Sequence, residues 1–135
     1  MMRAYLTKIV VLLALLSPGA LALGQQQTER YIPLGQSPGL SGKVTLIGEI
    51  AAVDAPSRRL TVATPQGARS VKVSDRTSIW IDRSLYRKTN LTGRFDDLKT
   101  GNKVEVLFAE GADRQVARWI KMQPPEPPGD SPARR

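Results

Sequence analysis

Short runs of alternating apolar and polar residues, each ended by turn residues, constrain the fold of this chain more than any other feature. They occur at 59–64, 69–73 and 103–108, and a longer β-rich run covers 44–53. Successive side chains of a strand point to opposite faces, so this pattern predicts strands with one face buried. Gly48, in the middle of the longest run, predicts a bulge or a sharp bend in its strand.

The runs predict one β domain over residues 42–122. A further short strand is expected at 77–81, one helical turn at 95–101, and a last strand at 115–122 that is bulky on both faces. Five or six strands around one small core, with one short helical turn, predict an all-β, OB-like barrel. Closure into a barrel would leave so short a domain without exposed strand edges. An open sandwich is the alternative.

Residues 1–22 have the organisation of a secretory signal peptide. Arg3 and Lys8 precede the apolar run 9–16, and small residues lead up to Ala22. The apolar run is much shorter than the roughly 20 residues that a membrane-spanning helix needs, so we expect no transmembrane segment after processing. We therefore predict cleavage near Ala22 and a periplasmic or secreted protein.

Two segments flank the predicted barrel. Residues 23–41 are rich in Gln, Pro and Gly and show no clear periodic pattern. We expect a flexible lead-in there, with Tyr31 and Ile32 docked on the domain as an extra short strand. Residues 123–135 are rich in proline, which removes backbone donors, and predict a disordered tail. A polyproline II ligand for a partner is the alternative to an inert tail.

The composition excludes several kinds of chemistry. The chain has no Cys and no His, and its formal net charge is +8. Without a thiolate or an imidazole, Ser-His-Asp and Cys-His catalysis and zinc sites built from Cys and His are ruled out. We predict no enzyme activity, no catalytic residues, no cofactor and no metal site. An exported domain without disulfides is typical of bacterial periplasms, which indicates a bacterial origin.

The stretch 76–94 is the most unusual part of the predicted domain, because it contains five basic residues and a single acid, Asp82. Arginines beside aromatic side chains suit phosphates, sugars or acidic polymers. A solvated loop whose charge only aids solubility is the alternative. Export and an aromatic content of 5% argue against dedicated nucleic-acid binding. The candidate anion- or partner-binding residues are Arg76, Trp80, Arg83, Tyr86, Arg87, Lys88 and Arg94.

Two other features have structural interpretations. Asp96 and Asp97 could be paired carboxylates, but adjacent residues point in different directions, so we interpret them as the start of the helical turn. Trp119, on the last strand, is expected in the core.

The segments 48–54, 59–62 and 97–106 resemble those of a family of exported bacterial OB-like domains of unknown function. The resemblance covers residues 42–122 and implies a non-enzymatic module outside the cytoplasm. The chain is also distantly similar to the periplasmic copper and silver efflux chaperones, small barrels that hold a metal with His and Met beside a Trp. Trp80 falls in a comparable region, but the His and Met ligands are missing, so none of that family's ligands transfers.

The predicted function is therefore a non-enzymatic, exported OB-like binding or interaction module. Its partner is unidentified; an anionic envelope polymer or an envelope protein is the expected kind. The alternative is a periplasmic module that handles a metal through oxygen ligands, as a degenerate relative of the copper chaperones.

Overall fold

The computed structural model describes residues 28–110 and 115–125. The predicted signal peptide, the first five residues of the lead-in and most of the proline-rich tail lie outside the described residues. Within them, no helix is both long and apolar enough to cross a membrane.

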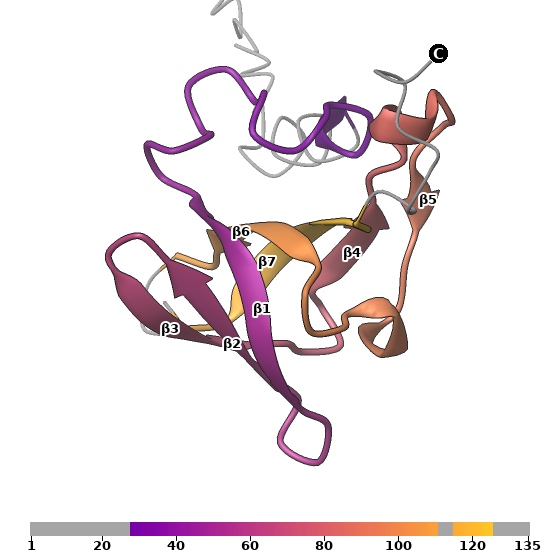
Figure 1. Cartoon of the computed structure of the whole chain (residues 1–135). Coiled ribbons are helices and arrows are strands. Elements are labelled where there is room, and N and C mark those ends of the chain that lie inside the picture. Colours follow the sequence, from indigo (N-terminus) through magenta and orange to yellow (C-terminus); the bar gives the residue numbers. More distant parts are fainter. Residues whose placement is uncertain (1–27, 111–114, 126–135) are drawn as a thin grey trace, which may run out of the picture.

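The fold is all-β, as predicted, with strands joined in one sheet (Figure 1). The order of the strands in the sheet is β3-β2-β1-β6-β7-β4-β5, and of the paired strands only β4 and β7 run parallel. Two single turns of 3₁₀ helix interrupt the later half of the described chain. The strands are β1 Leu46–Asp54, β2 Arg59–Thr64, β3 Gly67–Lys72, β4 Ser78–Ile81, β5 Leu91–Thr92, β6 Lys103–Phe108 and β7 Ala117–Gln123, and the turns are η1 Ser84–Tyr86 and η2 Phe95–Asp97.

A parallel bridge between Lys72 and Val116 closes this sheet into an OB-like barrel. The backbone N–H of Lys72 donates to the carbonyl of Gln115 at 2.8 Å, directly before β7 begins. Because β4 continues along the same side of β7, β3 and β4 act as two parts of one interrupted strand. The barrel then has five main strands and the two-residue β5 as an addition, which agrees with the five to six strands predicted.

The barrel interior holds the apolar residues that alternate along the strands. Val104 and Val106 of β6 and Ile120 of β7, for example, are fully buried in it. The β-branched side chains that dominate this core favour extended backbone, so burial and local conformation agree. The complete cluster of buried core residues is Ile50, Leu60, Val62, Val71, Val73, Ile79, Leu98, Val104, Val106, Ala117, Ile120 and Met122.

Strand β1 changes its partner strand next to Gly48, where the sequence predicts a bulge or a bend. It pairs with β6 up to Glu49 and with β2 from Glu49 onward, and its register slips between Ile50 and Ala52. A Cβ atom at Gly48 would collide with the carbonyl oxygen of Ala63. The glycine is therefore required by close approach of two strands, and the bulge itself follows it by two residues.

The helical turn expected at 95–101 is present in shorter form, as η2. The carboxylate of Asp97 accepts the backbone N–H of Arg94 at 2.7 Å, so this acid does cap the turn. The chain then reverses at Gly101, whose φ of +92° is in the left-handed region that glycine adopts without strain.

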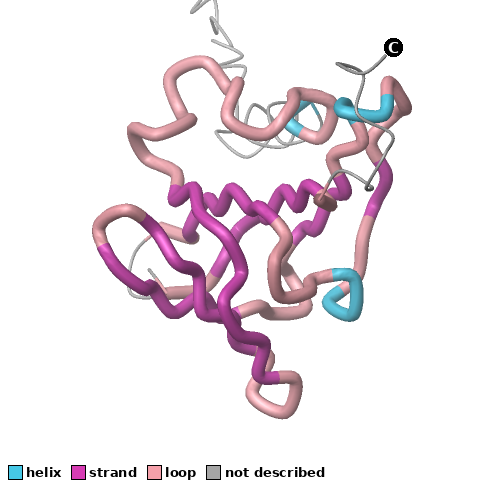
Figure 2. The backbone as a smooth tube through the Cα atoms, in the orientation of Figure 1, coloured by secondary structure: helices cyan, strands magenta, loops and turns pink. Residues whose placement is uncertain are grey.

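Residues 28–45, here called the N-terminal strap, cross the barrel above the outer face of β6, β7 and β4 (Figure 2). Successive turns shape the strap; the N–H of Gln36 donates to Pro33 and that of Leu40 to Ser37, both at 3.1 Å. Tyr31 and Ile32 lie in a turn and a bend, not in the extra strand that we expected. The expected docking is therefore made by other residues, Glu29 and Leu34, whose contacts hold this part of the predicted lead-in on the sheet.

Candidate binding face

The outer face of β6, β7 and β4 carries large polar and aromatic side chains where a solvated face would be expected. Glu105 and Trp80 lie directly across from Lys121, one on each neighbouring strand. All three are buried, although they point away from the barrel core. The N-terminal strap covers them, and their contacts explain why it lies there.

Lys121 is the central anchor of the strap. Its Nζ donates to Oε2 of Glu29 and to Oγ of Ser37, both at 2.9 Å, and lies 4.9 Å from the ring centroid of Trp119. The Lys121 side chain is 1% exposed. A charge this deeply buried needs partners, because the desolvation cost is several kcal/mol in the absence of pairing. The strap supplies both partners.

Glu105 anchors the next part of the strap. Its carboxylate accepts the backbone N–H of Gly35 at 2.9 Å and the hydroxyls of Ser41 and Thr45 at 2.6 and 2.7 Å. Three donors to one buried carboxylate satisfy it without a cation.

Asp82 anchors a third point and links the strap to η1. Its Oδ2 accepts the N–H of Leu34 at 2.8 Å and Nε2 of Gln123 at 3.2 Å, while Oδ1 accepts the N–H of Ser84 at 2.8 Å. The single acid of the stretch 76–94 is therefore fully buried and occupied by internal donors.

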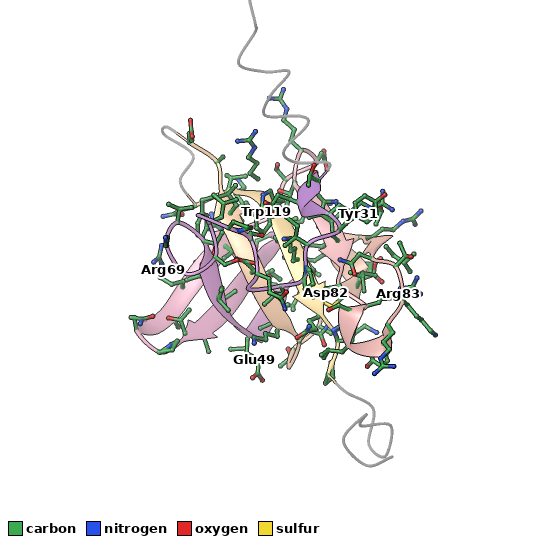
Figure 3. All side chains as sticks on the ribbon, turned by 90° about the horizontal axis from the view of Figure 1, so that it is seen from above. Tyr31, Glu49, Arg69, Asp82, Arg83 and Trp119 are labelled. Atoms are coloured by element: carbon green, nitrogen blue, oxygen red, sulfur yellow. The ribbon has the colours of Figure 1, made fainter. Side chains whose placement is uncertain are left out.

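The two tryptophans lie together beneath the strap. The ring centroids of Trp80 and Trp119 are 5.6 Å apart at an interplanar angle of 35°. Trp119 is buried as expected, but on the outer face of the sheet (Figure 3). Trp80, included among the candidate binding residues for stacking, is also buried.

Residues 83–90, here called the basic loop, follow β4 and are held from inside by Asn90. Its Oδ1 accepts the N–H of Arg83 and its Nδ2 donates to the carbonyl of Arg30 on the strap, both at 2.9 Å. The guanidinium of Arg83 closes the loop by donating from Nε to the carbonyl of Thr89 at 2.7 Å. The loop has a fixed backbone, tied to both the barrel and the strap.

The outside of the basic loop is cationic. Arg87 and Lys88 are exposed, and Arg87 adopts a left-handed conformation with a φ of +54°. Tyr86 is half-buried and donates its hydroxyl to the carbonyl of Pro125 at 2.8 Å. In the described part of the chain, no ion pair involves Arg83, Arg87 or Lys88.

The structure brings together some of the seven candidate residues and separates others. Arg83, Tyr86, Arg87 and Lys88 share the basic loop. The remaining two cations are exposed at the other end of the β4–β5 hairpin, since Arg76 precedes β4 and Arg94 follows β5. Trp80 lies between the two groups, under the strap. The charge that is continuous in sequence therefore forms two patches in space.

Sequence reasoning missed the buried charges, and one feature could have identified them. In the last strand, Trp119 and Lys121 alternate with Ile120 and Met122, so both faces carry large side chains. A barrel strand with bulk on both faces must be covered on its outer side. Among the described residues, no group of three or more acidic, His or Cys side chains is placed to hold a metal ion.

Comparison with known proteins gives only distant structural similarity. No family model matches the sequence, and no curated protein matches it. Among solved structures, a copper(II)-bound CusF variant from Escherichia coli matches with 15% identity and a TM-score of 0.41, over 58% of this chain and 89% of that one. Silver(I)-bound CusF matches with 15% identity and a TM-score of 0.40, over 58% and 95%.

Proposed function

We propose that the protein is a non-enzymatic, exported binding module that holds an anionic partner of the cell envelope at its basic loop. The observation that carries this proposal is a set of outward cations that form no ion pair with any residue in 28–110 or 115–125, on a backbone fixed from within. Arg87 and Lys88 are exposed, whereas the nearest acid in sequence, Asp82, is buried and occupied.

A fixed backbone supports a binding role. Asn90 and Asp82 tie the basic loop to the strap and the sheet, so the cations are presented with little freedom of the main chain. Less conformational entropy is then lost when an anion binds. Loops at the rim of OB barrels commonly carry the binding groups, and this loop leaves the barrel at the end of β4.

The absence of enzymatic function is part of the proposal. Glu105, Asp82 and Glu29 are the buried acids of the described chain, and each accepts hydrogen bonds from structural partners. A general base needs a carboxylate that can reach a substrate proton, and these carboxylates bind the strap to the barrel. The chain also has no His and no Cys to act in their place.

The test compares two double charge reversals of equal size. Arg87→Glu with Lys88→Glu reverses two of the basic loop's three cations, and Lys43→Glu with Lys99→Glu changes net charge equally at exposed positions elsewhere. Arg83 is left intact because its guanidinium closes the loop. On immobilised heparin, we expect the loop variant to elute at clearly lower salt than the control variant. Equal elution of the two variants would show that only net charge is sensed and would refute the proposal.

A further inference from the structure

The basic loop lies next to exposed apolar side chains. Tyr31 is 60% exposed, and Leu85 and Leu91 are each 42% exposed. The fourth large hydrophobic residue with high exposure in the described chain is Val44, at 58%, which lies at the other end of the strap. The other three lie at the start of the strap or in and next to the basic loop. These segments together are here called the basic corner.

Asn90 ties these segments together. It bonds to the carbonyl of Arg30, which precedes Tyr31, and to the N–H of Arg83, two residues before Leu85; Leu91 follows it directly. The start of the strap and η1 lie side by side in Figures 1 and 2, and Tyr31 and Arg83 lie on the same side of the molecule in Figure 3.

Tyr31 is itself paired with a cation. The guanidinium carbon of Arg30 lies 5.5 Å from the centroid of the Tyr31 ring. The corner thus presents an aromatic ring and a leucine beside arginine and lysine side chains. Tyrosine favours the boundary between hydrocarbon and water, and basic residues near it are attracted to anionic headgroups.

We propose that this corner docks on an anionic lipid bilayer, with Tyr31 and Leu85 entering the headgroup region and Arg87 and Lys88 contacting lipid phosphates. This inference rests on the proposed function and identifies the anionic partner as a membrane surface. A soluble polyanion would use the cations alone and would leave the exposed apolar side chains in water. A bilayer offers phosphate charge and an apolar layer at the same site, which matches both kinds of side chain.

The experiment measures binding to vesicles by the protein purified as the cell exports it, with its N-terminus read by mass spectrometry. Vesicles contain either phosphatidylcholine alone or phosphatidylcholine with phosphatidylglycerol. Binding should require the anionic lipid, and Arg87→Glu with Lys88→Glu should weaken it by more than about tenfold, since each basic residue near an anionic surface contributes about 1 kcal/mol.

A second pair of variants tests the apolar contribution. Tyr31→Ser with Leu85→Ser should weaken binding to anionic vesicles by about tenfold or more and leave heparin elution unchanged, because burial of one such side chain contributes at least about 1.5 kcal/mol. Val44→Ser removes an equally exposed apolar side chain away from the corner and should change neither measurement. The far-ultraviolet circular dichroism of each variant verifies its fold.

The outcomes separate this inference from the proposed function. If the Tyr31 and Leu85 variant binds anionic vesicles as tightly as the parent protein, docking on a bilayer is refuted. The proposed function still holds in that case if the charge reversal lowers heparin elution. If the charge reversal affects neither vesicles nor heparin relative to its control, both proposals fail.

Discussion

The salt bridge between Lys121 and Glu29 is the interaction that we expect to contribute most to holding the strap on the barrel. Lys121→Met replaces the buried ammonium with an apolar side chain of similar length. The change leaves the Glu29 carboxylate without its cation and Ser37 without one of its hydrogen-bond partners. Removing one member of a buried pair typically costs about 3–5 kcal/mol, because the other charge stays buried and uncompensated.

The side chain of Glu29 is 11% exposed, so water can solvate it in part and the lower end of that range applies. We therefore expect Lys121→Met to lower the free energy of unfolding by about 3 kcal/mol. For a domain of this size, that corresponds to a fall in Tm of roughly 12 °C or more. Urea unfolding followed by tryptophan fluorescence measures the change directly, because Trp80 and Trp119 are buried beneath the strap.

A double variant distinguishes loss of the ion pair from loss of packing. Lys121→Met combined with Glu29→Leu removes both charges, and buried ion pairs replaced by apolar residues often retain or gain stability. We expect the double variant to be more stable than Lys121→Met alone, with a coupling energy above about 1 kcal/mol. If Lys121→Met unfolds at the same urea concentration as the parent protein, the strap is not anchored by this pair and the reasoning is wrong.

Three further predictions concern other parts of the molecule. Gly48→Ala should destabilise the barrel by about 1–3 kcal/mol in urea unfolding, because a Cβ collides with the neighbouring strand; an unchanged midpoint would show that β1 and β2 can separate there. Asn90→Ala should speed amide hydrogen exchange in residues 83–90 and 28–34 and leave β6 protected, since it removes the bonds between loop and strap. Exchange rates equal to those of the parent protein, or an equal increase in β6, would contradict this. Adding Cu(I) should leave the Tm unchanged, because Met122 is the single thioether of the described residues and is buried in the core; a rise in Tm would indicate a site that the described residues do not show.

The strands could be predicted from the sequence because their signal is local. Burial of one face requires an apolar residue at every second position, and this requirement is visible in the runs 59–64 and 103–108. The glycine in the longest run likewise predicted an irregularity in β1, and the register slips two residues after Gly48. Closure into a barrel was predicted from the number of strands and from the need to avoid exposed strand edges, with an open sandwich as the alternative. The interruption between β3 and β4 could not be predicted from the alternation of apolar residues.

The strap could not be predicted in the same way, because its bonds join positions far apart in the chain. The partners of Asp82, Glu105 and Lys121 on the strap lie 48, 70 and 92 residues away in sequence. Two of these contacts use backbone N–H groups, which any residue type provides, so they leave no trace in composition. A segment held in this manner shows no regular pattern of apolar residues, so its sequence resembles that of a flexible lead-in.

The candidate site was partly predictable for a related reason. Charge is a property of each residue, so the concentration of cations in 76–94 is visible at once. Their grouping depends on the β4–β5 hairpin, which carries Arg76 and Arg94 to one end and the basic loop to the other. The place of Tyr31 beside the loop gave no signal, because Tyr31 comes from the strap, whose contacts with the barrel and with Asn90 join positions far apart in the chain.

The strap and the basic loop are held to the same buried side chain, Asp82, so the buried charges help to set the position of the surface cations. Asp82 accepts hydrogen bonds from Leu34 of the strap and from Ser84 at the start of η1. Displacement of η1 leaves Oδ1 of this buried carboxylate unpaired, and displacement of the strap leaves Oδ2 with the longer bond from Gln123 alone. Such a loss costs about 1–3 kcal/mol, which opposes independent motion of the two segments. In the proposed function, the buried acids would act on binding indirectly, because they fix the position of cations that they do not touch. A loop released from Asp82 would keep its charge but would have to lose more conformational entropy on each binding event.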